Sequence, residues 1–263
     1  MNPFQVVSKQ IIAQDIKRMD IAAPEIAKSA RPGQFVLVMV DAGSLRLPLP
    51  IVESNPQKGS ITIVFKEESL SEKKLGSLSI GQGLYVVMGP LGNPALPQEV
   101  GTSVCIGYEV GIARIISVSR YLHKEGTRNF GILGAATKRS LIMESQMRLS
   151  SQSIFVMSED GSVGKKGFVT DALYDVLGRY PVDHIFVAAP SKVIQEVLRV
   201  VGDPKIKIKA VMPPLALSGI GLCGSDQIKV NHAYVAVSLD GPIFDARDID
   251  FNLYDARLKR IYG

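Results

Sequence analysis

Cysteine is scarce in this sequence, and long apolar runs are missing from it. The chain of 263 residues contains two cysteines, Cys105 and Cys223, whose spacing matches neither a metal-ligand pair nor a disulfide framework. No apolar run approaches the roughly 20 residues that a membrane helix needs, and the opening segment MNPFQVVSKQ lacks the apolar centre of a signal peptide. We therefore expect a cytoplasmic protein with reduced thiols and no membrane segment.

Blocks of like charge are also missing. The formal net charge of +5 is spread along the chain, and the basic residues are not interleaved with aromatic ones. Nucleic acid is therefore not an expected partner. The composition, 46% hydrophobic and 21% charged, is typical of a globular protein with a sizeable core, and the length suits two domains and a small appendage.

The first part of the chain carries short apolar runs rich in β-branched residues. Runs such as GQFVLVMV and GSITIVFKEE are separated by Gly, Pro and Asn. Short strands with turn signals between them are typical of a small antiparallel barrel. We predict such a barrel over residues 1–98.

After the stretch NPALPQEV, strand-like runs alternate with segments of helical period. A buried strand is predicted over residues 104–108, and helices are predicted over 112–125 and 139–150. Strands separated by helices of this length pair in parallel through right-handed crossovers. We therefore predict an α/β domain of the nucleotide-binding type over residues 99–205. Residues 206–263 follow as a lobe with a glycine-rich loop, a hairpin and a polar tail.

The segment LRLPLPI, residues 45–51, holds a single cation among apolar residues. Its guanidinium, on Arg46, can pair with a phosphate in a bidentate manner. The two prolines, Pro48 and Pro50, favour an extended backbone whose polar groups are open to a flat ligand. An ordinary proline-bearing edge strand is the alternative.

Several longer strings carry a resemblance to a known family. They are RPGQFVLVMV, LRLPLPI, GSITIVFKEESLSEKKLGSL, VMGPLGNP, ILGAATKRSLIMESQM, EDGSVGKKGFVTDAL and DGPIFDARDIDF. In this order they resemble the ferredoxin-NADP reductase superfamily, and they are similar to its small flavoprotein subunits: the electron-transfer subunit of dihydroorotate dehydrogenase and the alpha subunit of NADH-dependent ferredoxin-NADP oxidoreductase. The resemblance covers nearly the whole chain. It implies an antiparallel flavin-binding barrel, a parallel-sheet nucleotide-binding domain and a small C-terminal lobe.

The resemblance also implies where FAD binds. The arginine-proline motif carries over to Arg46, Pro48, Leu49, Pro50 and Ile51. Pro50 stands where the family usually has Ser or Thr, so one hydroxyl hydrogen bond to the flavin is missing.

A second FAD element of the family contacts the pyrophosphate. It carries over to the run from Ser69 to Glu72, in which Ser71 is the expected contact. The carboxylate of Glu72 weakens pyrophosphate binding there unless it points away.

The nicotinamide element of the family is a glycine-rich turn, and here it reads GYEVGIAR. Gly107 and Gly111 are retained, whereas Tyr108 and Glu109 occupy glycine positions and Arg114 replaces a proline. Such a turn normally brings backbone amides close to a pyrophosphate. An aromatic ring and an anion at that place argue against tight NAD(P)H binding.

Two further segments correspond to the nicotinamide side of the family. Asp160, Gly161 and Ser162 look like the family loop beside the pyridine nucleotide, with a solvated turn as the alternative. In the run from Ala189 to Ile194, the family's glycine and both methionines are lost.

The C-terminal lobe of the family holds a two-iron two-sulfur cluster. Its ligand positions carry over to Ser218, Cys223, Asp226 and Ser238. Such clusters are held chiefly by thiolates, and three hard oxygens match that coordination poorly. We therefore expect that the cluster is absent and that this chain holds no metal.

No other active site is predicted. His123, His184 and His232 lie on separate segments without an HExxH pattern, and no G-x-S-x-G motif is present. Neither a metalloenzyme nor a hydrolase is expected, and no catalytic residue is assigned.

Two functions of different class remain open. The first is an FAD-binding electron-transfer subunit of a multi-subunit NAD(P)H/ferredoxin-type flavoprotein oxidoreductase, whose partner is a larger flavoprotein/iron-sulfur subunit. The second is a non-catalytic structural or regulatory subunit that has lost its redox cofactors. Glu72 and Glu109 distinguish them, because carboxylates that face the phosphate sites favour the second function.

Overall fold

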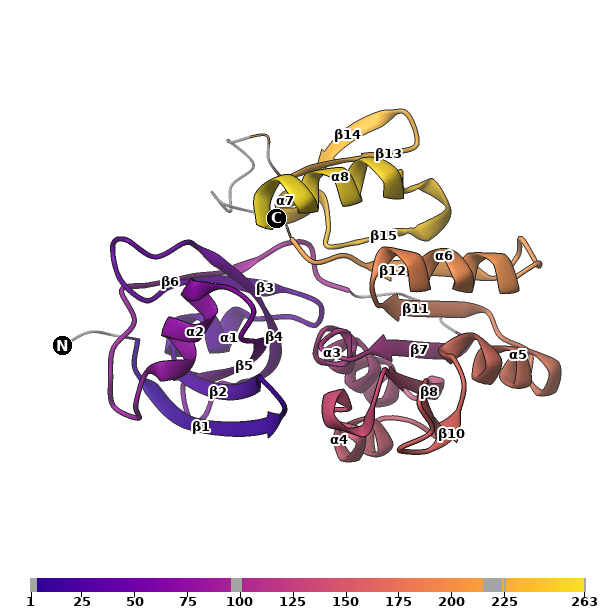
Figure 1. Cartoon of the computed structure of the whole chain (residues 1–263), viewed down its shortest axis with the longest axis horizontal. Coiled ribbons are helices and arrows are strands. Elements are labelled where there is room, and N and C mark those ends of the chain that lie inside the picture. The colour runs from indigo at the N-terminus through magenta and orange to yellow at the C-terminus, as the bar shows by residue number, and fades with distance from the viewer. Residues whose placement is uncertain (1–3, 96–100, 215–223, 225, 263) are drawn as a thin grey trace. The chain divides into compact units, whose positions relative to one another are not determined.

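The computed structural model describes residues 4–95, 101–214, 224 and 226–262. The chain divides into two compact units, each built from segments that are distant in sequence (Figure 1). We call them the barrel unit, composed of Met1–Ala95, Pro213–Pro242 and Asn252–Gly263, and the α/β unit, composed of Leu96–Met212 and Ile243–Phe251.

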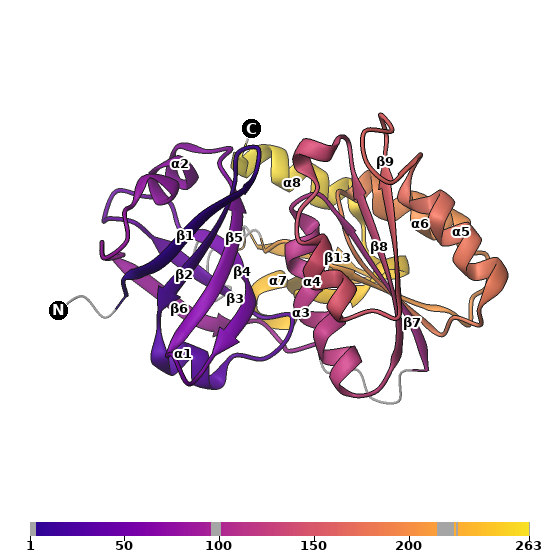
Figure 2. The same cartoon turned by 90° about the horizontal axis from the view of Figure 1, so that it is seen from below.

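The barrel unit contains a six-stranded antiparallel sheet in the order β1-β2-β5-β4-β3-β6. Figure 2 shows its strands curving around a common interior. Alternate side chains such as Met19, Ile21 and Ile63 fill the apolar core. The elements are β1 (Val6–Ala13), β2 (Ile16–Ala22), α1 (Pro24–Ser29), β3 (Phe35–Met39), β4 (Leu47–Asn55), β5 (Ser60–Lys66), α2 (Leu70–Ser77) and β6 (Val86–Leu91).

The two prolines of β4 lie where the strand has one neighbour. Pro48 and Pro50 are paired with Leu37 and Phe35 of β3, and pairing with β5 begins only at Ile51. A proline cannot donate to a neighbouring strand, so it is tolerated where one side is unpaired. The strand is thus an edge over its proline half and interior over the rest.

The α/β unit contains a seven-stranded sheet in the order β10-β9-β8-β7-β11-β12-β15. All neighbours pair in parallel except β12 and β15. Its strands are β7 (Thr102–Tyr108), β8 (Arg128–Ala135), β9 (Ser153–Ser158), β10 (Lys165–Lys166), β11 (His184–Ala188), β12 (Lys207–Val211) and β15 (Ile243–Asp245). The chain runs outward from β7 through β8 and β9 and then returns to β11 on the other side of β7. The carboxyl ends of β7 and β11 therefore mark the switch point where ligands bind in open α/β sheets.

Helices connect the parallel strands of this sheet. They are α3 (Gly111–Lys124), η1 (Lys138–Ser140), α4 (Glu144–Leu149), α5 (Val169–Arg179) and α6 (Ser191–Val200), and η2 (Ala246–Asp248) follows the antiparallel strand β15. The predicted antiparallel barrel and parallel α/β domain are both confirmed. The helix predicted over residues 139–150 is shorter than expected, because Met143 has a left-handed backbone (φ 55°) and α4 begins only at Glu144.

The last part of the chain contributes to both units. β13 (Gln227–Val230) and β14 (Ala233–Ala236) form the predicted hairpin, which α7 (Val237–Asp240) follows. In the barrel unit, Tyr254 of α8 (Phe251–Tyr262) donates its hydroxyl hydrogen bond to the Pro213 carbonyl at 3.2 Å. β15 instead pairs with β12 in the α/β unit.

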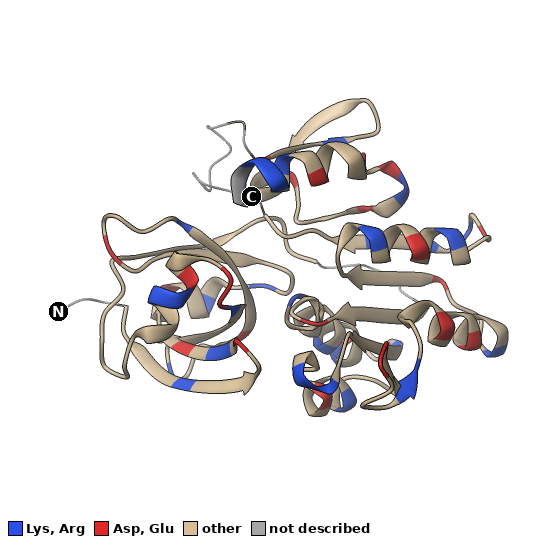
Figure 3. Cartoon of the chain, viewed as in Figure 1, with Lys and Arg blue, Asp and Glu red and all other residues tan. Residues whose placement is uncertain are grey.

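Charged residues of both signs are spread over both units, as Figure 3 shows. This distribution agrees with the modest net charge of +5. Within the described ranges, no helix is long and apolar enough to cross a membrane.

Candidate functional site

In the barrel unit, the segment of Arg46 is held against the first turn of α2. The amide of Leu45 donates a hydrogen bond to Ser71 Oγ at 3.1 Å, and Ser71 is buried. Asp41, at the start of the same loop, pairs with Lys74 of α2. The bonds from Lys74 and Ser44 lower the pKa of Asp41, so this carboxylate stays ionised at neutral pH. The two segments that the sequence predicts as FAD elements therefore lie together.

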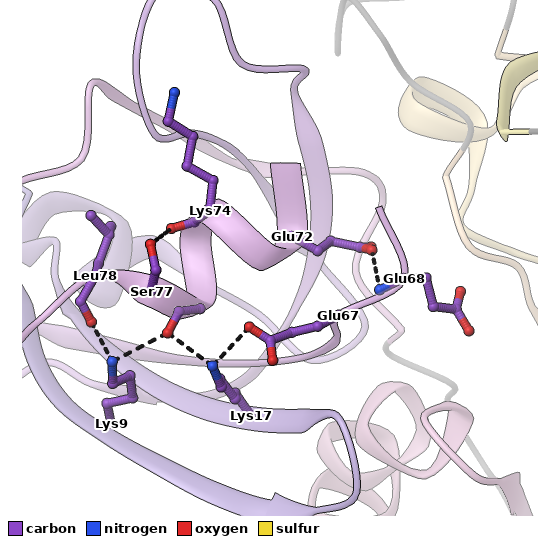
Figure 4. A network of polar contacts seen from close by, with 9 residues as sticks. Lys9, Lys17, Glu67, Glu68, Glu72, Lys74, Ser77 and Leu78 are labelled. Atoms are coloured by element: carbon purple, nitrogen blue, oxygen red, sulfur yellow. Dashed lines mark hydrogen bonds and ion pairs between the residues drawn. The ribbon is translucent and has the colours of Figure 1, made fainter. Parts of the chain in front are cut away.

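The first turn of α2 is stabilised by its own side chains. Ser69 and Glu72 form a capping box, in which Ser69 Oγ accepts from the Glu72 amide at 3.3 Å and Glu72 Oε2 accepts from the Ser69 amide at 2.8 Å. Glu72 Oε2 also accepts from the Glu68 amide at 2.9 Å (Figure 4). Among the described residues, the amides of Leu70 and Ser71 have no protein acceptor. The helix start thus retains amide donors even though Glu72 occupies part of it.

The other acidic residues before α2 are also paired. Glu67 forms an ion pair with Lys17 at 2.7 Å, and Glu68 forms one with Lys66 at 2.7 Å. With Glu72 bonded to two amides, each carboxylate in this run has a positive or donating partner inside the protein. Their repulsion of a pyrophosphate is therefore reduced.

The far end of α2 is held by two lysines from the sheet. Lys9 and Lys17 both donate to the Gly76 carbonyl, at 3.2 and 3.0 Å, and Lys9 also donates to the Leu78 carbonyl at 2.6 Å (Figure 4). Cations at a helix C-terminus satisfy its carbonyls and interact favourably with the helix dipole. The helix that positions Ser71 is therefore fixed at both ends.

The barrel unit brings together the segment that carries Arg46, two helix-start amides and the extended proline-rich backbone of β4. These groups are the chemistry that FAD phosphates need. On this observation the residues fit the cofactor, with Glu72 as the one group placed against it.

In the α/β unit, the two retained glycines have a packing role. A Cβ on Gly107 would lie 2.7 Å from Ile112 Cα, and a Cβ on Gly111 would lie 2.1 Å from the Ala188 carbonyl oxygen. Both glycines let α3 lie close against β7 and β11. Their presence is explained without a bound nucleotide.

The turn between these glycines is held by its own side chains. Glu109 has a left-handed backbone (φ 47°), and its Oε1 accepts from the Ala136 amide at 3.2 Å and from Ser140 Oγ at 2.9 Å. The Tyr108 hydroxyl donates to Glu159 Oε1 at 2.5 Å. Burial, and secondly this bond to Glu159, raise the pKa of Tyr108, so the phenol stays protonated and keeps donating.

The loop after β9 completes this edge of the sheet. Asp160 accepts from the Ser162 amide at 2.9 Å and from its hydroxyl at 2.7 Å, and these bonds lower the pKa of Asp160. Gly161 has a φ of 81°, which suits glycine in this turn. Ser162 Oγ accepts from the Lys138 amide at 2.8 Å. The loops after β7, β8 and β9 are thus tied to one another by the protein's own groups.

The cluster positions are only partly described. Ser218 and Cys223 lie outside the described residues. Asp226 is fully buried, and its Oδ2 accepts from the Ser238 amide at 2.7 Å. Within the described part of the chain, Ser238 Oγ is buried without a partner, and no group of three or more His, Cys, Asp or Glu could hold a metal. The described positions supply hard oxygens, which do not fit an iron-sulfur cluster.

The sequence did not indicate the partners that define these sites. Leu45, Ala136, Ser140 and Glu159 lie far along the chain from the residues that they bond. Each belongs to a string that resembles the family, but no string indicates which residue it bonds. The histidines remain outside the sites: His123 and His232 are exposed, and His184 is buried at the start of β11.

Comparison with known proteins agrees with this architecture. No family model matches the chain. A Thermotoga maritima protein named dihydroorotate dehydrogenase B (NAD(+)), electron transfer subunit homolog, is 30% identical over 257 residues, which cover 98% of this chain and 90% of that protein. The chain belongs to the family of dihydroorotate dehydrogenase B electron transfer subunits and their homologues, within the ferredoxin-NADP reductase superfamily. The family resemblance predicted from the sequence is confirmed.

Other members of the superfamily are similar over most of their length. The electron transfer subunit of dihydroorotate dehydrogenase B from Bacillus pumilus is 28% identical over 255 residues, 93% of this chain and 96% of that protein. The solved NADH-dependent reduced ferredoxin-NADP oxidoreductase matches with a TM-score of 0.91 at 28% identity, over 100% of this chain and 97% of that chain. Phthalate dioxygenase reductase matches with a TM-score of 0.60 at 17% identity, over 80% and 67% of the chains, which shows the shared fold alone.

Proposed function

We propose that this chain is an FAD-binding electron-transfer subunit of a multi-subunit NAD(P)H/ferredoxin-type flavoprotein oxidoreductase. Its partner is a larger flavoprotein/iron-sulfur subunit. Similarity to electron transfer subunits along almost the whole chain supports this function. The observation that carries it is the Leu45–Ser71 bond, which holds the Arg46 segment at the start of α2.

FAD, when bound, supplies hydride and one-electron chemistry. The Arg46 guanidinium would pair with its pyrophosphate, and the amides of Leu70 and Ser71 would donate to the same group. The extended backbone from Pro48 to Ile51, with Leu49 and Pro50, would lie along the flavin. Pro50 contributes no hydroxyl, so flavin binding there depends on backbone groups.

Flavin content after mutation tests this proposal. Arg46→Ala is expected to weaken FAD binding by about 2 to 5 kcal/mol, the usual loss for one partner of a desolvated charge pair. Arg31→Ala removes an equal charge from an exposed position of the barrel unit and serves as the control. The flavin-to-protein ratio is measured by absorbance on the complex purified with its partner. Equal flavin content in both variants would show that Arg46 has another role.

We also propose that this chain lacks an iron-sulfur cluster of its own. Hard oxygens at Asp226 and Ser238 support this, since the Asp226 carboxylate already accepts from the Ser238 amide. Iron and sulfide are determined on the separated subunit. Stoichiometric iron with the absorbance of an iron-sulfur centre in this chain would overturn the proposal.

A non-catalytic structural or regulatory subunit is the second candidate. The observation that favours it is that Glu72 and Glu109 both accept hydrogen bonds from backbone amides at the two turns where the family binds phosphates. The same absorbance measurement separates the candidates. A complex whose small subunit releases no flavin is the outcome that the second function requires.

A further inference from the structure

The carboxyl edge of the parallel sheet is the place where this fold would bind a dinucleotide. The order of the strands reverses between the parallel neighbours β7 and β11, and the loops after β7, β8 and β9 meet at this edge. Phosphates bind at such edges through backbone amides and hydroxyl groups. A nucleotide can therefore bind at this edge only if such donors are not already hydrogen-bonded within the protein.

In this chain a carboxylate accepts from two donors at this edge of the sheet. Glu109 Oε1 accepts from the Ala136 amide at 3.2 Å and from Ser140 Oγ at 2.9 Å. Its own amide donates to the Gly134 carbonyl at 2.8 Å, which holds the turn against β8. The backbone at Glu109 is left-handed (φ 47°), a conformation that favours glycine. The hydrogen bonds of the Glu109 carboxylate thus stabilise a backbone conformation that is unfavourable for a residue other than glycine.

Neighbouring contacts close the same edge. Tyr108 bonds Glu159 at 2.5 Å across the loops after β7 and β9. Lys138 donates its amide to Ser162 at 2.8 Å across the loops after β8 and β9. A dinucleotide would have to break these bonds and to bring its phosphates beside the Glu109 carboxylate.

We propose that Glu109 acts as an internal substitute for a nucleotide phosphate and closes the α/β unit to NADH and NADPH. This inference does not depend on whether the barrel unit binds FAD. Combined with the proposed function, it means that the flavin exchanges electrons with the partner subunit and takes no hydride from a nucleotide bound to this chain.

Nucleotide binding by the full chain tests the inference. Wild type is expected to show no shift in melting temperature with NADH or NADPH at about 1 mM, the upper end of ordinary substrate affinities. Glu109→Gly suits the left-handed backbone, frees the Ala136 amide and removes the charge, and is expected to bind at least about tenfold more tightly than wild type. Glu125→Gly removes the same charge from the exposed C-cap of α3 and is expected to behave like wild type.

Hydrogen exchange at the Ala136 amide provides a second measurement. The amide is expected to be protected in wild type and in Glu125→Gly, and to exchange at least about tenfold faster in Glu109→Gly. Rapid exchange of this amide in wild type would overturn the inference. Micromolar binding of NADH or NADPH by wild type would also overturn it, as would a folded Glu109→Gly variant with no gain in binding. The flavin content of the same samples reports separately on the proposed function.

Discussion

Gly111→Ala tests whether the retained glycines serve packing. Gly111 begins α3, and an added Cβ would lie 2.1 Å from the carbonyl oxygen and 2.8 Å from the carbonyl carbon of Ala188. Those atoms belong to the backbone of β11, which pairs with β7 and β12, so they cannot rotate away as a side chain could. The helix must move outward from the sheet.

The magnitude follows from two opposing effects. Overpacking costs about 3 kcal/mol at the upper end of its usual range, which suits a clash with backbone. Alanine in a helix gains at most about 1 kcal/mol over glycine. We therefore expect Gly111→Ala to lower the free energy of unfolding by about 2 kcal/mol. For a chain of this size that corresponds to a fall of about 4 to 8 °C in melting temperature.

Gly178→Ala is the matched control. Gly178 lies in α5, and a Cβ there would meet no heavy atom within 4 Å. The same substitution is expected to stabilise the protein by about 0.5 to 1 kcal/mol. Both variants are compared by calorimetry and urea unfolding. If Gly111→Ala is as stable as Gly178→Ala, packing does not explain why Gly111 is a glycine. A role of Gly111 in nucleotide binding would then be favoured.

Two further predictions concern buried ionisable groups. Burial raises the pKa of the Cys105 thiol to about 12, so iodoacetamide should leave Cys105 unmodified in the native protein and label it in urea; native labelling, read by peptide mass spectrometry, would contradict this. Burial, and secondly Lys207, lower the pKa of His184, so its folded form resists protonation. The unfolded histidine binds a proton near pH 6.5, and the stability from neutral His184 should fall as the pH drops from about 7 to 5. His184→Gln should flatten this slope in urea titrations, and an unchanged slope would exclude His184 as its source.

The alternation of apolar runs was enough to predict both kinds of sheet. The short β-branched runs before residue 95 form the antiparallel strands, and the strand-helix rhythm after residue 101 forms the parallel sheet. These features depend on the chain's local period, which the sequence displays directly. The helix over residues 139–150 was predicted too long because the left-handed Met143 carries no signal in its residue type.

The residue types of the sites were likewise readable from the sequence alone. An arginine between leucines at Arg46, a carboxylate at Glu109 and hard oxygens at Asp226 and Ser238 state which chemistry is present and which is missing. The family resemblance was also readable, because the strings that carry it consist of neighbouring residues. Their partners could not be read in this way.

Only the tertiary structure decided what these side chains do. Whether Glu109 repels a phosphate or replaces one depends on Ala136 and Ser140, and the need for Gly111 depends on the Ala188 carbonyl. Such partners are brought together by sheet pairing and helix packing, which join segments distant in sequence. The sequence therefore determined the elements and the available chemistry, and the fold determined which donor meets which acceptor.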